Sequence, residues 1–180
     1  MIDFVLSDLR RVAEDFWPAG TAESWDRVGL VAGRNEAPLR RVLLAVDAVN
    51  ATVGEAVEWG ADALLVHHPL LLRGIHSVAT TTAKGATVTA LVVADLALYV
   101  AHTNADSADI GVNTALAAAC GLSDTEPLTI SEGVGMGLVG DLPESISLAD
   151  FARRLASRLP SAPALRRWPA GRGMRGISWD

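Results

Sequence analysis

The chain of 180 residues is long enough to bury one substantial core, or one domain and part of a second. Half of its residues are apolar, which indicates a globular protein and excludes a largely disordered one. No apolar run reaches the roughly 18 residues that a membrane-spanning helix needs, and residues 1–4 lack the basic start of a secretory signal. The single cysteine, Cys120, excludes an internal disulfide, so we expect a cytoplasmic protein that does not associate with membranes.

Charge is distributed unevenly along the chain. Residues 1–152 carry a net charge of −12, whereas residues 153–180 carry +6 from seven arginines and one acid. An arginine-rich end of this kind could bind nucleic acid or an anionic surface. The chain also has 14 arginines against the single Lys84, a bias typical of GC-rich coding. Residues 161–180 are therefore interpreted as an irregular tail that is either such a binding segment or a stretch read out of frame.

The amino-terminal half predicts a helix followed by a strand–helix–strand unit. Apolar spacing over residues 3–16 predicts an amphipathic helix, and a loop over 24–29 leads into a short strand at 30–33. A β pattern over 41–46 ends in Asp47, and a helix over 52–59 has Gly60 as its carboxyl-terminal cap. The next strand is expected at 63–66. This order predicts parallel strands joined by a right-handed crossover.

The second half continues with alternating helices and strands. The patterns predict a helix at 80–95, a strand at 96–101, a loop after His102, a helix at 112–120 and a further sheet segment at 133–142. Residues 135–140 match the glycine-rich dinucleotide fingerprint, but no helix follows them, so we interpret them as a glycine-rich strand. A capping box at Ser147–Asp150 opens a helix that runs to about 159. From residue 160 onward no periodicity remains.

Three of the four histidines follow two of the predicted strands. His67 and His68 come after the strand at 63–66, and His102 and Asp106 come after the strand at 96–101. Ligands of open α/β sheets bind at the carboxyl ends of the strands. Histidine together with carboxylate suits first-row divalent metals. The pattern therefore predicts one half of a metal site, whereas His76 has no partner pattern and is not expected to be a ligand.

The roles of these residues remain open at the level of sequence. Adjacent residues in a regular strand point to opposite faces, so His67 and His68 would serve two neighbouring ions, or one ion if the strand has ended. The two oxygens of Asp106 could bridge two ions. His102 could be a ligand, an orienting residue or a proton shuttle. Asp47 either lines the same pocket or caps the next helix. The alternative interpretation is that these are structural histidines and ordinary turn-forming aspartates.

Four segments together resemble one protein family in their order and spacing. They are Ser24-Trp25-Asp26-Arg27-Val28-Gly29-Leu30, Gly60-Ala61-Asp62 leading to His67-His68-Pro69-Leu70, Ala101-His102-Thr103-Asn104-Ala105-Asp106, and Gly111-Val112-Asn113. Over about residues 1–160 the sequence resembles the Nif-three-like family, also called dinuclear metal centre hexameric proteins or type 2 GTP cyclohydrolase I homologues.

The resemblance implies an α/β fold of the Nif-three-like type, with a mixed, largely parallel sheet built from βαβ units and flanked by helices. It implies a metal-binding lobe at 1–123, the start of a second lobe at 124–160, and a homohexamer. His67, His68 and Asp106 would bind two divalent ions (zinc, iron, manganese, cobalt or nickel), with His102 close by as the catalytic residue that moves protons. If the family label holds, the substrate is a nucleotide whose purine ring is opened by a metal-activated water.

The sequence departs from the family near its end. Family members supply a late His-x-x-x-Glu pair that completes the site, but no histidine follows His102 here. We therefore expect an incomplete second lobe and weaker metal binding. Three hypotheses result: a metal-dependent hydrolase-like protein, a non-enzymatic metal-binding scaffold that forms a ring, and a nucleic-acid binder that uses the arginine-rich tail. We rank the last of these lowest.

Overall fold

The computed structural model describes residues 4–159, so the arginine-rich tail proposed for 161–180 lies outside the described residues. A four-stranded sheet in the order β1-β4-β3-β2 forms the centre of the first part of the molecule. β2, β3 and β4 are parallel, and β1 is antiparallel to β4. The largely parallel sheet predicted from the strand–helix–strand pattern is thus confirmed. Its strands are β1 (Gly29–Ala32), β2 (Val42–Asp47), β3 (Ala63–His68) and β4 (Ala97–Val100).

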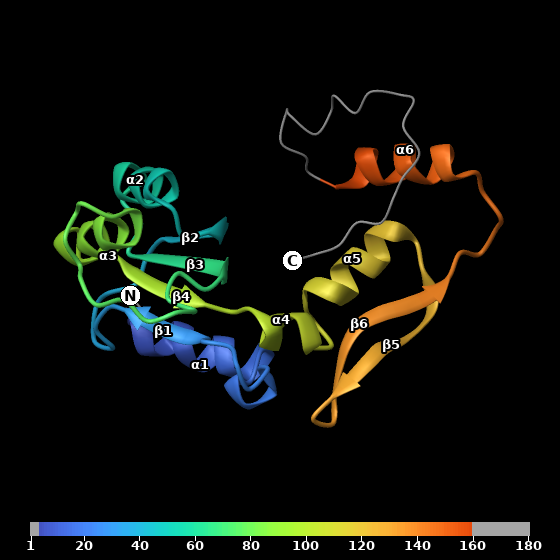
Figure 1. The fold of residues 1–180 in the computed structure, drawn as a ribbon, viewed down its shortest axis with the longest axis horizontal. Helices are drawn as coiled ribbons and strands as arrows, with labels where there is room; N and C mark the ends of the chain where they lie inside the picture. Colours follow the sequence, from blue (N-terminus) through green and yellow to red (C-terminus); the bar gives the residue numbers. More distant parts are fainter. Residues whose placement is uncertain (1–3, 160–180) are drawn as a thin grey trace.

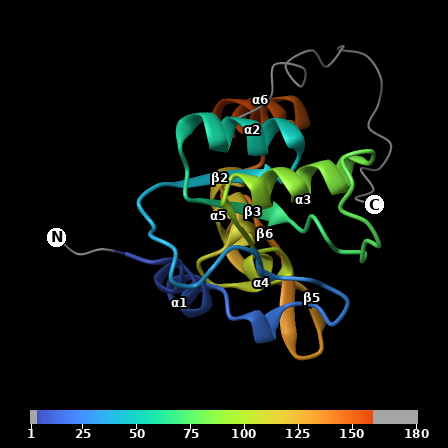
Figure 2. The same ribbon diagram turned by 90° about the vertical axis from the view of Figure 1, so that its left-hand side faces the viewer.

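Helices cover both faces of this sheet. α2 (Asn50–Trp59) and α3 (Ala83–Val93) lie side by side on one face, and α1 (Leu6–Phe16) lies on the other (Figures 1 and 2). Leu64 and Leu98 of the central strands pack into one core cluster with α2 and α3, while Tyr99 packs with Ala13 of α1. β4 is buried along its whole length, as expected for a central strand covered on two sides.

The sheet topology gathers four chain segments at one edge. The parallel strands β2, β3 and β4 all end there, so Asp47, His68 and the residues after Val100 are neighbours. β1 runs in the opposite direction, and its first residue, Gly29, pairs with Val100. The loop that precedes β1 therefore reaches the same edge. This arrangement brings residues from four separate parts of the sequence within reach of one another.

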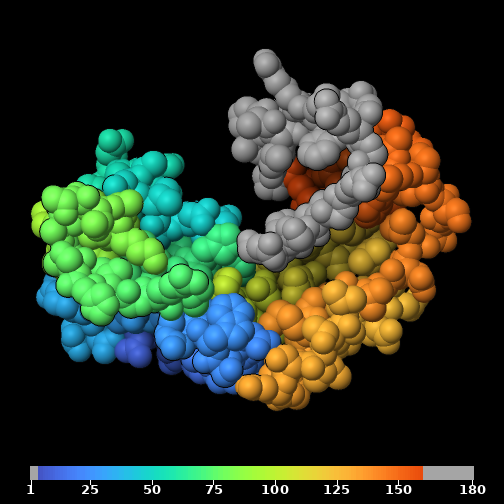
Figure 3. Space-filling view, viewed as in Figure 1, coloured from blue at the N-terminus to red at the C-terminus, as the bar shows by residue number. Residues whose placement is uncertain are grey.

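The second part of the molecule is a hairpin with helices. Trp17 Nε1 donates to the carbonyl oxygen of Ile110 at 3.0 Å, and Ser131 Oγ donates to Glu23 Oε2 at 3.1 Å, which links the hairpin turn to the loop before β1. Blue and orange residues adjoin at this place in Figure 3. The elements here are α4 (Thr103–Ser107), α5 (Val112–Cys120), β5 (Ser123–Ser131), β6 (Val134–Asp141) and α6 (Leu148–Arg158), with a short 3-10 helix (Ala19–Thr21) facing α4.

Most predicted elements are present, and three differ. The helix predicted at 80–95 begins at Ala83, because Thr82 caps it by accepting from the Gly85 amide at 3.1 Å. The predicted loop after His102 is wrong, since α4 begins at the next residue. β5 was not expected, whereas the glycine-rich segment is strand β6 as predicted. Within residues 4–159 no helix has the length and apolar character to cross a membrane.

Candidate metal centre

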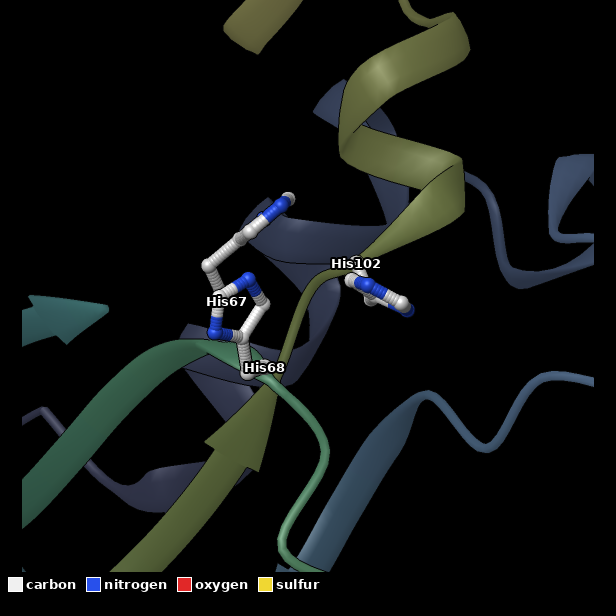
Figure 4. Close-up of side chains that lie close together, drawn as sticks. All are labelled: His67, His68 and His102. Atoms are coloured by element: carbon white, nitrogen blue, oxygen red, sulfur yellow. The ribbon is translucent and has the colours of Figure 1, made fainter. Parts of the chain in front are cut away.

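Three imidazoles meet at the carboxyl edge of the four-stranded sheet. His67, His68 and His102 each offer one ligand nitrogen, and these atoms lie within 4.8 Å of one another. The ring centroids are 5.0–5.8 Å apart. Figure 4 shows His67 and His68 at the end of β3 and His102 across from them, where the chain leaves β4. The structure thus brings together the three histidines that the sequence placed after successive strands.

His67 and His68 converge although they are adjacent in a strand. β3 extends two residues past β4, because Val66 pairs with Val100, the last residue of β4. His67 Nδ1 instead lies 3.0 Å from the carbonyl oxygen of Ala101. His68 still pairs with Asp47 on β2, but it is the last residue of β3. The alternation that separates side chains in a regular strand therefore does not keep these two rings apart.

Each imidazole has an acceptor on its Nδ1 atom. The distances are 3.0 Å from His67 to the Ala101 carbonyl, 2.8 Å from His68 to Asp47 Oδ1, and 2.9 Å from His102 to Asp26 Oδ2. A carbonyl and two ionised carboxylates only accept hydrogen bonds, which assigns the proton to Nδ1 and a lone pair to Nε2. Histidine ligands of metals are oriented by acceptors of this kind. The donor set of this structure therefore fits a divalent metal.

Asp47 belongs to the site and does not cap α2. Its carboxylate faces His68, as just described, whereas the N-cap of α2 is Val49, which makes no side-chain capping bond. Of the two roles open at the level of sequence, the pocket-lining one is confirmed. The pair is more than half exposed, so its contribution to folding stability is small.

Asp26 is a site residue to which the sequence analysis gave no role. Its side chain is fully buried, and Oδ2 accepts from His102 Nδ1, from the Thr103 amide at 3.1 Å and from the Thr103 hydroxyl. Oδ1 accepts from the Arg27 amide at 2.7 Å. Burial alone would raise the pKa of Asp26, but the hydrogen bonds from Thr103, His102 and the Arg27 amide outweigh it and lower the pKa below its ordinary value. Asp26 is therefore a carboxylate at neutral pH and fixes the orientation of His102.

Asp106 lies beside the histidines, on α4. Its Oδ1 is 3.7 Å from His67 Nε2, although it is not one of the three closest groups. α4 is anchored by the buried Asn104, whose Nδ2 donates to the carbonyl oxygen of Trp17 at 2.8 Å. Burial raises the pKa of Asp106, and the neighbouring His67 and His102 act in the opposite direction. His76 is exposed and lies outside the cluster.

Comparisons with known proteins agree with this geometry. The chain is 48% identical over 161 residues to a Streptomyces coelicolor protein named GTP cyclohydrolase 1 type 2 homolog, which covers 87% of this chain and 56% of that protein. A Clostridium perfringens protein of the same name is 33% identical over 159 residues, covering 86% of this chain and 60% of that protein. The chain spans between 30% and 60% of the length of such curated relatives.

Solved structures and a family model give the same assignment. A Staphylococcus aureus hypothetical protein has a TM-score of 0.77 at 26% identity, covering 86% of this chain and 64% of that one. A Bacillus cereus protein related to NIF3 has a TM-score of 0.70 at 34% identity, covering 73% and 36%. The model described as Duf34/NIF3 (NGG1p interacting factor 3) matches residues 4–171. With this match over most of its length, the chain belongs to the Duf34/NIF3 family.

Proposed function

We propose that this chain carries a divalent metal centre held by His67, His68 and Asp106, and that it acts on a nucleotide as a metal-dependent hydrolase of the GTP cyclohydrolase type 2 kind. The observation that carries the proposal is the convergence of three imidazoles, each with a protein acceptor on Nδ1. When bound, a divalent ion supplies a Lewis acid that can activate water or polarise a substrate oxygen.

We infer two ions, with further ligands from outside this chain's residues. Three imidazoles and one carboxylate are few ligands for two divalent ions. The curated relatives are considerably longer than this chain, so that the missing ligands would come from their additional residues or from water. The metal is one that accepts nitrogen and oxygen ligands together, which includes zinc, iron, manganese, cobalt and nickel.

His102 is the proposed proton carrier. Its Nδ1 is held by the buried carboxylate of Asp26, which leaves Nε2 free to accept a proton and favours the protonated ring that results. Trp25, about half exposed, places its ring 6.1 Å from the His102 ring in an edge-on arrangement. An exposed aromatic surface beside the centre suits a planar base, which supports a nucleotide as the substrate.

A metal titration tests the ligand assignment. Metal-stripped wild type, a His67→Ala/His68→Ala double variant and a His76→Ala control would each be titrated with zinc and manganese. Because two imidazole ligands are removed, we expect the double variant to bind at least tenfold more weakly, and the exposed His76 to be dispensable. Equal affinity of the double variant and the wild type would rule out these two ligands.

An activity assay separates the enzyme from its alternative, a metal-binding scaffold that assembles into a ring such as a homohexamer. Wild type and His102→Ala would be incubated with a panel of purine nucleotides, with and without added metal. Loss of a general acid or base typically slows a reaction by about 100- to 10,000-fold, so we expect metal-dependent turnover that His102→Ala largely abolishes. Metal binding without turnover of any nucleotide would favour the scaffold, whose assembly light scattering would measure.

A further inference from the structure

A pocket of about 260 Å³ adjoins the histidine cluster. His68 and Asp47 form its wall on the side of the cluster, and the first residues of α2 and α3 form much of the rest, with Asn50, Lys84 and Thr87 as the polar members. We propose that this pocket binds the phosphate groups of the nucleotide, with Lys84 as the cationic contact. The inference rests on the function proposed above and adds a second part to its binding site.

Lys84 is the cation that distinguishes this pocket. It is the only lysine of the chain, and it lies in a segment of 152 residues with a net charge of −12. Among residues 4–159, Lys84 takes part in no ion pair. Its ammonium group, with three donors, is therefore available to a ligand, and an ammonium at the end of a flexible stem is a common contact of phosphate.

The backbone of the pocket wall favours the same kind of ligand. α2 and α3 are 10 and 11 residues long, and the first residues of both line the pocket. The Thr87 hydroxyl donates to Oδ1 of Asn50 at 2.7 Å, which ties the starts of the two helices together. Amides in the first turn of a helix lack intrahelical acceptors and carry partial positive charge. In α3 the Gly85 amide is used by Thr82, so Ala83 and Lys84 supply the amides nearest the pocket.

Asp47 is the one carboxylate of the pocket wall, and its charge is partly compensated. Its Oδ1 lies 2.8 Å from His68 Nδ1, so the carboxylate is engaged with the imidazole. His68 belongs both to the pocket and to the metal-binding cluster. A phosphate chain bound at Lys84 would therefore lie next to the metal centre and direct the attached nucleoside toward it.

Titration of the metal-free chain with inorganic triphosphate tests the inference without involving the metal. Wild type, Lys84→Gln, Lys84→Arg and a control, Arg73→Gln, would be compared by calorimetry at low ionic strength. Arg73 is an exposed cation outside the pocket wall. We expect Lys84→Gln to lose about tenfold in affinity, Lys84→Arg to stay within about threefold of wild type, and Arg73→Gln to remain unchanged.

The result is read independently of the proposed function. Equal triphosphate affinity of wild type and Lys84→Gln overturns the phosphate subsite, and so does an equal loss in Arg73→Gln, which would indicate unspecific attraction by charge. Zinc titration of the same variants is the second measurement. Because Lys84 is no member of the histidine cluster, Lys84→Gln should bind zinc as wild type does; absence of zinc binding in wild type would reject the metal centre and leave the triphosphate comparison valid.

Discussion

Asp26 is the carboxylate on which the orientation of His102 depends. Replacing it by asparagine keeps the shape but puts an amide, itself a donor, among the donors of His102, Thr103 and Arg27. A buried donor without an acceptor costs about 1–3 kcal/mol. We expect Asp26→Asn to lower the free energy of unfolding by that amount, measured by urea denaturation, and to weaken metal binding about 10- to 100-fold.

Asp95→Asn is the matched control for this change. Asp95 also forms a close pair, with Arg34 at 2.6 Å, but both side chains are largely exposed. Exposed pairs are screened by water and add little to stability. Asp95→Asn should therefore unfold close to the wild type and bind metal normally. If both variants were destabilised equally, burial would not be the property that makes Asp26 important.

The sequence predicted the histidines of the site but not the carboxylate behind one of them. His67, His68, His102 and Asp106 each follow an apolar run, and the rule that parallel strands end at one edge is enough to bring them together. Asp26 precedes its strand and lies 76 residues from His102. It reaches the edge because β1 is antiparallel to β4, and no local pattern in residues 29–32 states that direction.

Glycine at the start of α5 lets two helices approach closely. A Cβ atom on Gly111 would lie 2.1 Å from the carbonyl oxygen of Ala105 and 2.8 Å from that of Ala108. Gly111→Ala should thus force α4 and α5 apart and cost about 1–3 kcal/mol of unfolding free energy. The comparison is Gly54→Ala within α2, where nothing lies within 4 Å of the added atom; we expect it to stabilise by about 0.5–1 kcal/mol. Destabilisation by both would contradict this account.

Elements with local signals were predictable, and those defined by packing were not. The capping box at the start of α6 is present, with the Asp150 amide donating to Ser147 Oγ at 3.1 Å. β5 gave no comparable signal, because Pro127 interrupts it and Leu128 and Ile130, which would suggest a core, are 67% and 69% exposed. α4 is only five residues long, too short for a periodic pattern.

The core of the molecule is confined to its first part. Among the described residues, the buried hydrophobic side chains lie between Leu6 and Ala105, with Ala117 as the one later member. A two-stranded hairpin is only marginally stable without further packing. In hydrogen–deuterium exchange we therefore expect the amides of β5 and β6 to exchange well before those of β3 and β4. Equal protection would mean that the hairpin is stabilised in solution by contacts beyond those of residues 4–159.

The imidazoles and their acceptors come from the ends of β2, β3 and β4 and from the loop before β1. A cation bound to the three rings would cross-link all four segments at a single rim of the sheet. Fraying of any one strand would then require the cation to be released first. The opposite rim has no such tie, so a chelator should loosen the molecule from one side only.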